Sequence, residues 1–286
     1  MLADLHVHTS ASDGANTPAE VVRMAAEIGL RAVAITDHDT LDGIWVAREA
    51  ARRYAIDVVS GIELSTDDSG LEVHVLGYCV DPDNALLQEK LHVFRHARLN
   101  RAEKIVQKLH ELGMPLSLGK VLELAGDGSV GRPHIARAMV NTGYVASIAD
   151  AFKYYIGVGK PAYVPRFKFH PVEMIKLIKK VGGVPVLAHP GITCAETMVL
   201  LLIEEGLQGL EVYHPKHSPD MEKKYLALCR KFRLIATGGS DFHGVSAAGH
   251  GKLGEAVVPY ETVARLRELA EENGRRSHAV GAGKGT

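Results

Sequence analysis

"DLHVHTSASDG", residues 4–14, places two histidines and two aspartates within eleven residues near the start of the chain. His6 and His8 alternate with Leu5 and Val7. Because alternate residues of a β-strand share a face, both imidazoles point to one side of the strand and both apolar side chains to the other. The stretch therefore predicts a strand that buries one apolar face and presents two imidazoles together, followed by a polar loop.

Helices and strands alternate along the chain after this stretch. Residues 17–30 predict a helix, with Thr17 as its N-cap and Pro18 at its first position. Apolar, strand-like runs lie at residues 31–39, 56–65 and 72–80. This alternation is typical of an α/β fold with a parallel sheet or barrel, in which active sites lie at the carboxyl ends of the strands.

Composition excludes several classes of function. The 286 residues are 46% apolar and carry 33 Lys and Arg against 34 Asp and Glu, which argues against binding of long duplex DNA. The cysteines at positions 79, 194 and 229 show no CxxC spacing, so neither a disulfide framework nor a thiolate metal site is expected. We find no signal peptide and no run that would span a membrane, and we therefore predict a cytoplasmic protein.

A long helical stretch interrupts the α/β pattern. From about Asp83 to Tyr155 the sequence is largely helical, and strand-like runs resume only later. We therefore predict a discontinuous barrel domain, a helical insertion that forms a lid over the barrel mouth, and a flexible tail. The predicted boundaries are 1–82 and 166–274 for the barrel, 83–165 for the insertion, and 275–286 for the tail.

Histidines and carboxylates gather where the predicted strands end. Most of them follow an apolar run or lie beside Gly, Pro or Ser. The set comprises His6, His8, Asp13, Asp37, His38, Asp39, Glu63, His74, His189, Asp241 and His243. Such a set without cysteine suits Zn, Mn or Fe, and it exceeds the roughly four positions around one ion. It therefore predicts two or three metal ions with a bridging carboxylate.

Several motifs occur in an order that resembles the PHP (polymerase and histidinol phosphatase) superfamily. They are DLHVHTSASDG, ITDHD, GIE, VHVLGY, AHPG, GLEVYHPKHS and GSDFHG, and the resemblance extends to about Ser246. It implies a distorted (β/α)7 barrel with a trinuclear metal centre. GRPHIARAMV and YYIGVGKPAYVP, in the insertion, resemble one subgroup. That subgroup includes phosphoesterases that act on nucleoside 3′,5′-bisphosphates and on the 5′ ends of short RNAs.

The resemblance also implies which residues hold the metal ions. The first ion would be held by His6, His8, Glu63 and Asp241. Glu63 would bridge to a second ion, which is completed by His74 and His189. The third ion would be held by Asp13, His38 and His243. Some family members carry histidine at the position of Asp13, so this chain has a harder third site. Three divalent ions are therefore expected, Mn first, with Fe or Zn as alternatives.

Phosphate ester hydrolysis also needs a proton donor and a group that selects the substrate. Divalent ions would neutralise the phosphate oxygens and activate a water molecule. His217 is the predicted general acid because it lies beyond a strand end and is not needed as a ligand, and Asp39 is the alternative. A second anion pocket is predicted from Arg132 and His134, at a helix start, and from Lys160, in a Gly-rich loop.

The predicted function is therefore that of a metal-dependent phosphoric ester hydrolase. It would remove the 5′-phosphate of nucleoside 3′,5′-bisphosphates, release 5′ nucleotides from short 5′-phosphorylated RNA, or do both. One alternative is a histidinol-phosphate-type phosphatase, which the insertion and Asp13 disfavour. Another is a metal-dependent amidohydrolase, although no lysine lies at an obvious strand end to be carbamylated. A third is a non-catalytic PHP module, which would be expected to have lost metal ligands.

Overall fold

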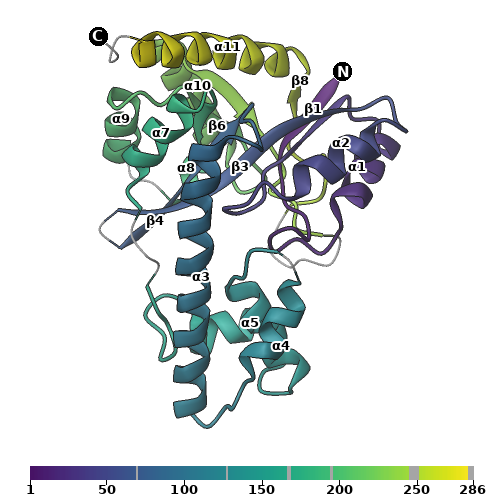
Figure 1. Cartoon of the computed structure of the whole chain (residues 1–286), viewed down its shortest axis with the longest axis vertical. Coiled ribbons are helices and arrows are strands. Elements are labelled where there is room, and N and C mark those ends of the chain that lie inside the picture. Colours follow the sequence, from purple (N-terminus) through teal and green to yellow (C-terminus); the bar gives the residue numbers. More distant parts are fainter. Residues whose placement is uncertain (69, 127, 166–168, 194–195, 245–250, 283–286) are drawn as a thin grey trace.

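A mixed eight-stranded sheet forms the centre of the molecule (Figure 1). The computed structural model describes residues 1–68, 70–126, 128–165, 169–193, 196–244 and 251–282. Residues 166, Cys194 and Ser246 of the sequence analysis lie outside these ranges. The strands are β1 (Leu2–Val7), β2 (Ala32–Ile35), β3 (Asp57–Asp68), β4 (Leu71–Tyr78), β5 (Val184–Leu187), β6 (Gly209–Tyr213), β7 (Ile235–Gly238) and β8 (Val258–Pro259).

The direction of the strands differs in part from the parallel arrangement that the alternation of elements predicts. β1, β2 and β3 pair in parallel, as do β5, β6 and β7. β4, however, pairs antiparallel with both β3 and β5. The physical reason is that β4 follows β3 without a crossover helix, and parallel pairing requires such a crossover.

Contacts between β1 and the segment after β7 nearly close the sheet into a barrel. The Asp241 N–H donates to the His6 carbonyl at 2.9 Å, and the His8 N–H donates to the Phe242 carbonyl at 2.9 Å. Gly239 permits this approach, because a Cβ atom there would overlap the backbone of His6. The sheet is thus an almost closed barrel, as the resemblance implies, although its strands are mixed in direction.

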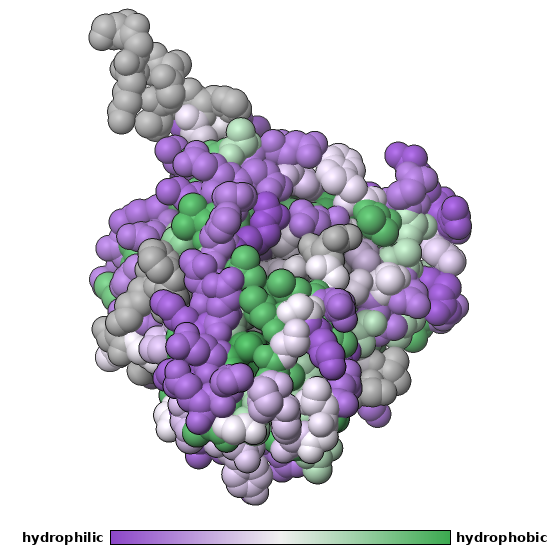
Figure 2. Space-filling view, turned by 60° about the horizontal axis from the view of Figure 1, so that its bottom comes forward, coloured by the Kyte–Doolittle hydropathy of each residue, from purple (hydrophilic) through white to green (hydrophobic). Residues whose placement is uncertain are grey.

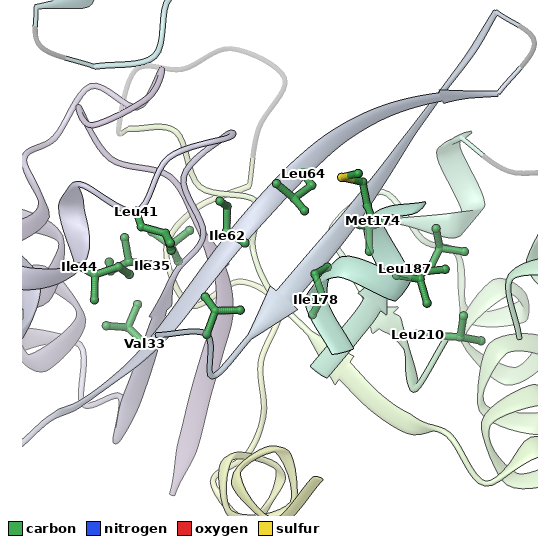
Figure 3. Close-up of a cluster of buried hydrophobic side chains, with 14 of the residues drawn as sticks. Val33, Ile35, Leu41, Ile44, Ile62, Leu64, Met174, Ile178, Leu187 and Leu210 are labelled. Atoms are coloured by element: carbon green, nitrogen blue, oxygen red, sulfur yellow. The ribbon is translucent and has the colours of Figure 1, made fainter. Parts of the chain in front are cut away.

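Helices cover the outside of the barrel, and the last of them lies across the end away from the insertion (Figure 1). They are α1 (Pro18–Glu27), α2 (Gly43–Ala51), α7 (Pro171–Lys180), α8 (Pro190–Thr193), α9 (Glu196–Glu204), α10 (Pro219–Phe232) and α11 (Glu261–Ala282). The predicted start of α1 is confirmed, since the Thr17 side chain accepts the Glu20 N–H and Pro18 is the first helical residue. Figure 3 shows strand residues such as Ile62 packed between α2 and α7 side chains, including Ile44 and Ile178.

The insertion has a hydrophobic core of its own and projects from the barrel (Figure 1). It contains α3 (Ala85–Glu111), α4 (Leu118–Ala125), α5 (Arg132–Asn141), α6 (Ile148–Ala151) and the π-helix η1 (Phe152–Ile156). The buried residues of this core lie between Ala102 and Ala162. The insertion is therefore held together by its own packing as well as by its contacts with the barrel.

The last helix is longer than the sequence analysis expected. A flexible tail was expected from residue 275, but α11 continues to Ala282. The Ser277 hydroxyl donates to the Lys179 carbonyl at 3.2 Å, which ties this part of the helix to α7. Residues 283–286 of the expected tail lie outside the described ranges. No helix in those ranges combines the length and the apolar composition that a bilayer crossing needs.

Candidate metal centre and adjoining pocket

The structure brings all nine predicted metal ligands to one end of the barrel. Each belongs to at least one group of three or four side chains whose ligand atoms lie within 4.8 Å of one another. The groups are His6, His8 and Asp241; His6, Glu63 and His189; His38, Glu63 and His74; and His8, Asp13, His38 and His243. Every strand from β1 to β5, and the segment after β7, thus supplies a ligand or leads directly into one.

One cluster has the spacing of ligands around a shared ion. The Nε2 atoms of His6 and His8 are 3.1 Å apart. Glu63 Oε2 lies 3.4 Å from His6 Nε2 and 3.1 Å from His8 Nε2, and Asp241 Oδ1 lies 3.6 and 3.3 Å from the same two atoms. Ligand atoms bound to one ion at about 2.1 Å lie roughly 3–3.5 Å apart in a tetrahedral arrangement. The donor set therefore fits a metal ion.

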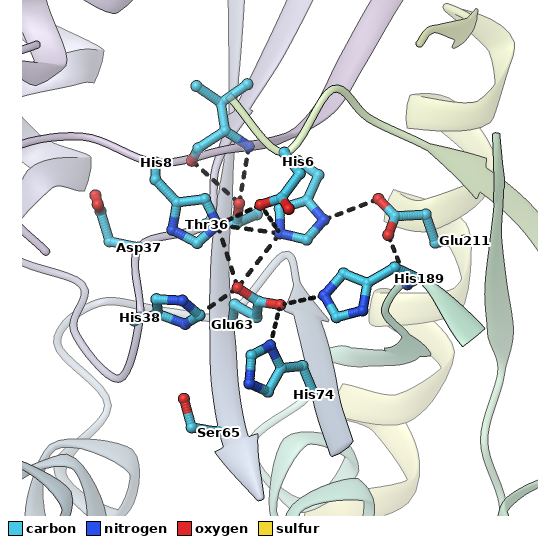
Figure 4. A network of polar contacts seen from close by, with 12 residues as sticks. His6, His8, Thr36, Asp37, His38, Glu63, Ser65, His74, His189 and Glu211 are labelled. Atoms are coloured by element: carbon cyan, nitrogen blue, oxygen red, sulfur yellow. Dashed lines mark hydrogen bonds and ion pairs between the residues drawn. The ribbon is translucent and has the colours of Figure 1, made fainter. Parts of the chain in front are cut away.

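The second oxygen of Glu63 faces another pair of histidines (Figure 4). Glu63 Oε1 is 2.8 Å from His74 Nδ1 and 3.0 Å from His189 Nε2. Its carboxylate is only 1% exposed. One buried carboxylate thus has its two oxygens in different histidine clusters, which is the geometry that a bridging ligand needs.

Asp13 lies at the third group. Its Oδ1 is 3.4 Å from His243 Nε2, and its Oδ2 is 4.0 Å from His38 Nε2. His38 also places Nδ1 3.1 Å from Glu63 Oε2, so it lies between this group and the Glu63 carboxylate. The His8 and His243 rings stack with their centroids 4.0 Å apart. The three groups are therefore contiguous.

Charge is concentrated and balanced within the cluster. Burial opposes a charged His6, but Glu211, Glu63 and Asp241 raise its pKa well above the usual 6.5. Burial likewise opposes a charged Glu63, whose pKa is nevertheless held well below its usual value by His38 and three further histidines. Among the described residues, the buried Nδ1 atoms of His8 and His38 make no hydrogen bond, although Glu63 Oε2 lies 3.1 Å from His38 Nδ1. A cation would satisfy such atoms and displace the histidine protons.

Backbone strain also marks this end of the barrel. Asp39, His189 and Asp241 adopt positive φ angles of 54°, 29° and 52°, which non-glycine residues rarely do. Hydrogen bonds hold all three: the Asp39 N–H donates to the Glu63 carbonyl at 3.1 Å, the His189 N–H to Glu211 Oε2 at 2.7 Å, and the Asp241 N–H to the His6 carbonyl at 2.9 Å. Strain of this kind persists where the surroundings fix the conformation, and it concentrates at functional sites.

The two candidates for the general acid both have structural partners. His217 is buried, its Nδ1 donates to the Val212 carbonyl at 2.8 Å, and its Nε2 accepts the Gly191 N–H at 3.1 Å. Burial lowers the pKa of His217 below its usual value. Asp39 accepts the Ser65 N–H at 2.8 Å and pairs with Arg98 Nε at 2.6 Å. Both side chains are thus engaged in holding the fold.

Two functional candidates were missed by sequence reasoning. Glu211 is fully buried and contacts both His6 and His189. His214 is buried beside the cluster, with Nε2 3.6 Å from Asp241 Oδ2. The available signal for Glu211 was a charged residue within the apolar strand GLEVY, and for His214 it was a second histidine in YHPKHS.

A pocket of about 290 Å³ joins the histidine cluster to the insertion. Seven of the nine predicted ligands, together with Glu72, line its barrel side, while α3, α5 and η1 line the other. Its basic side chains are Arg98, Arg101, Arg132 and Lys216. Its apolar side chains include Ile105, Ile135 and Phe152. In Figure 2, the face toward the insertion end shows hydrophobic side chains at its centre with hydrophilic ones around them.

The three predicted anion-binding residues occupy different surroundings. Arg132 lines the pocket, with Nη2 3.1 Å from Glu72 Oε2 and its guanidinium 5.5 Å from the centre of the Phe152 ring. His134 is buried, and its Nδ1 accepts the Gly131 N–H at 3.0 Å at the start of α5. Lys160 is exposed in a turn and does not belong to the pocket lining. Of the three, the structure therefore brings Arg132 into the pocket.

Comparisons with known proteins agree with this architecture. The family model of the PHP domain matches residues 4–96. The chain is 37% identical to the 5′-3′ exoribonuclease Rnm of Escherichia coli, over 85% of each chain. It is 33% identical to a 3′,5′-nucleoside bisphosphate phosphatase of Chromobacterium violaceum, over 86% of this chain and 88% of that one. A crystal structure from Bifidobacterium adolescentis, assigned as a metal-dependent phosphoesterase, superimposes with a TM-score of 0.87 at 33% identity, over 93% and 96% of the two chains.

Proposed function

Because this chain belongs to the PHP-domain family of metal-dependent phosphoesterases, we propose that it hydrolyses a phosphate ester of a nucleotide that carries phosphate on both its 5′ and its 3′ side. Nucleoside 3′,5′-bisphosphates and short 5′-phosphorylated RNAs both meet this description. The observation that carries the proposal is the pocket in which the histidine cluster faces Arg98, Arg101 and Arg132. A cluster that binds cations and a set of guanidinium groups suit two separate phosphates.

The nine clustered residues are proposed as ligands of three divalent ions. His6, His8 and Asp241 would share the first ion with Glu63, whose other oxygen faces His74 and His189. Asp13, His38 and His243 would hold the third. Bound ions would neutralise the phosphate oxygens and supply an activated water. Mn²⁺ is the proposed ion because a carboxylate at position 13 makes the third site harder than a histidine would.

The chain's own cations would then orient the substrate. Arg132 lies next to Phe152, so a phosphate at the guanidinium could have an apolar or aromatic group of the same substrate beside it. Arg98 is held by Asp39 and Ser65, which fixes the guanidinium against the barrel. The volume of about 290 Å³ lies at the lower end of the ~300–1,000 Å³ typical of small-molecule sites. Such a pocket would accept one nucleotide and leave the rest of an oligomer outside.

Which of the two phosphates is cleaved is a separate part of the proposal. The sequence analysis predicts that the 5′-phosphate meets the metal ions. Removal of nucleotides from a 5′ end, however, breaks the ester on the 3′ side of the terminal nucleotide. The similarity to a 5′-3′ exoribonuclease therefore favours a second candidate, in which the 5′-phosphate lies at the arginines and the 3′ ester meets the metal ions.

A phosphate-release screen with Mn²⁺ tests the proposal. Adenosine 3′,5′-bisphosphate, adenosine 5′- and 3′-monophosphate, a 5′-phosphorylated RNA trimer, histidinol phosphate and a small amide substrate would be compared by kcat/KM. We expect the bisphosphate and the trimer to be the best substrates. Chromatography of the nucleoside product then distinguishes removal of the 5′-phosphate from removal of the 3′-phosphate. Equal or faster turnover of histidinol phosphate, or turnover of the amide alone, would contradict the proposed substrate class.

A further inference from the structure

Glu211 is a fully buried carboxylate that contacts two of the predicted ligands without belonging to the predicted ligand set. It lies in β6, between Leu210 and Val212, which pack into the barrel core. Its side chain has no exposed surface. A buried carboxylate costs several kcal/mol unless charge and hydrogen bonds compensate it. The partners of Glu211 therefore indicate why the fold retains a charge at this position.

The two oxygens of Glu211 hold two different elements (Figure 4). Oε1 is 2.8 Å from His6 Nδ1, on β1, and Oε2 accepts the backbone N–H of His189 at 2.7 Å, after β5. His6 belongs to the first proposed metal position and His189 to the second. The rings of His6 and His189 stack with their centroids 5.7 Å apart. One carboxylate thus contacts one ligand from each of two neighbouring positions.

The contact to His6 also decides which ring nitrogen is available. An ionised carboxylate only accepts hydrogen bonds, so the Nδ1 atom that faces it must carry a proton. In the neutral ring the lone pair is then on Nε2, which faces His8, Glu63 and Asp241. The contact to His189 acts on the backbone instead, at a residue whose φ angle of 29° needs support.

We propose that Glu211 is a positioning residue that prepares His6 and His189 together for metal binding, and so couples the first two metal positions. It does this from outside the ligand set, by fixing the tautomer of one ligand and the backbone of the other. The inference rests on the metal assignment under the proposed function. Carboxylates that orient metal-bound histidines typically contribute 10–100-fold to metal affinity.

Glu211→Gln is a sharp test because an amide cannot replace both contacts. If the amide oxygen accepts the His189 N–H, the amide NH₂ faces His6 Nδ1 and drives the ring proton to Nε2, which removes a ligand atom. If the amide is reversed, its NH₂ faces the His189 N–H and two donors oppose each other. Either orientation damages one of the two positions.

The experiment is a titration of the metal-free full-length chain with Mn²⁺, by calorimetry and by competition with a chelator. We expect Glu211→Gln to weaken the tightest Mn²⁺ binding by about 10–100-fold. Electron paramagnetic resonance of the loaded protein should also show loss of the spin coupling expected between neighbouring Mn²⁺ ions. Asp57→Asn is the matched control, because Asp57 is a carboxylate of the same sheet that also holds other elements, with Oδ2 3.0 Å from the Tyr260 hydroxyl and Oδ1 2.9 Å from Arg267 Nη2, and neither partner is a predicted ligand. Its effect on Mn²⁺ affinity should be smaller.

The outcomes separate this inference from the proposed function. A wild-type chain that binds no Mn²⁺ contradicts the metal assignment itself. A wild-type chain that binds Mn²⁺, together with a Glu211→Gln variant of equal affinity and equal spin coupling, overturns the role of Glu211 alone. An equal loss in Asp57→Asn would also overturn it, since loss of any paired carboxylate of the sheet would then suffice. If Glu211→Gln does not fold, Glu211→Asp decides: wild-type Mn²⁺ affinity in that shortened variant contradicts the inference, and weakened affinity supports it.

Discussion

The two sides of the pocket are built in different ways. On the barrel side, short side chains from strand ends contact one another at 2.8–3.4 Å, as in the contacts of Glu63 with His8 and His74. On the insertion side, the polar groups are long arginine side chains carried by helices with a separate hydrophobic core. A rigid cluster suits the chemistry that all substrates share, whereas groups on an inserted element suit selection of a particular substrate.

Arg98 lies where these two sides meet. It comes from α3, yet its Nε pairs with Asp39 at 2.6 Å and its Nη2 donates to Ser65 Oγ at 2.9 Å, both on the barrel. Its Nη1 lies 3.4 Å from the Val130 carbonyl, just before α5. The Ser129 N–H also donates to the Ala11 carbonyl at 3.0 Å, in the loop that leads to Asp13. The insertion is therefore fixed against the metal centre at two points.

Removal of the metal ions from the barrel side of the pocket should have the largest effect on activity. The clustered donor atoms predict more than one equivalent of Mn, Fe or Zn per chain, and removal of these ions with a chelator should reduce phosphate release to background. Elemental analysis before and after reconstitution, beside the activity, checks this. At most one ion per chain after reconstitution would contradict the three-ion assignment.

Glu63→Gln should have the next largest effect. It keeps the shape of the side chain but removes the charge that faces both histidine clusters, and we expect kcat/KM to fall roughly a thousandfold or more. Glu72→Gln is the matched control, because Glu72 lines the same pocket but pairs with Arg132. Near-normal turnover by Glu63→Gln, or an equal loss in Glu72→Gln, would remove Glu63 from the bridging position.

The contrast between the two sides also explains what the sequence could predict. On the barrel side, ligands follow strand periodicity and motif spacing, so alternation and resemblance together named residues that the structure places in one cluster. The antiparallel position of β4 was not predicted from the alternation of elements, because strand direction depends on the connection between β3 and β4. Glu211 was not predicted as a functional residue because its partner His6 is 205 residues away in the sequence.

The residues on the insertion side of the pocket were harder to predict from the sequence, for a physical reason. Arg98 and Arg101 lie within a long charged helix whose sequence suggests a solvated surface, and their place in the pocket depends on how α3 packs against the barrel. Arg132 was predicted as an anion-binding residue because the neighbouring proline marks a helix start, which can be recognised from the local sequence. Lys160 shared the glycine-rich surroundings of an anion-binding loop, but its turn leaves the side chain exposed. Local signals do not report such packing.

Arg132→Ala should affect one class of substrate more than another. Loss of a charge-assisted contact costs about 1.5–3 kcal/mol, which corresponds to roughly tenfold to a hundredfold in kcat/KM for substrates with a second phosphate. Turnover of a nucleoside monophosphate should change little, and bound metal should not change. Kinetics on adenosine 3′,5′-bisphosphate and on both monophosphates measure the difference. An equal loss on all three substrates would show that Arg132 does not bind the second phosphate.

His217→Asn tests whether His217 supports the fold or donates a proton. Because its ring contacts the Val212 carbonyl and the Gly191 N–H, we expect a loss of about 1–3 kcal/mol in the free energy of unfolding. The kcat of the folded variant should stay close to wild type. Urea denaturation and phosphate release measure the two quantities. A fall of roughly 10²–10⁴ in kcat without loss of stability would instead support the predicted general acid.

Lys160→Ala should have the smallest effect, and it tests how far the proposed phosphate-binding surface of the insertion extends. The Lys160 N–H donates to the Gly157 carbonyl at 3.0 Å and its carbonyl accepts the Tyr163 N–H at 2.9 Å, so the turn is held by backbone contacts that alanine preserves. The side chain itself is exposed and outside the pocket lining. An exposed charge at such a position contributes about 0–1 kcal/mol, and less at high salt.

We therefore expect kcat/KM of Lys160→Ala for adenosine 3′,5′-bisphosphate to fall less than about fivefold at low salt. The double variant Arg132→Ala with Lys160→Ala should resemble Arg132→Ala alone. A loss with Lys160→Ala as large as with Arg132→Ala, and confined to substrates with a second phosphate, would mean that this turn closes onto the pocket when substrate binds.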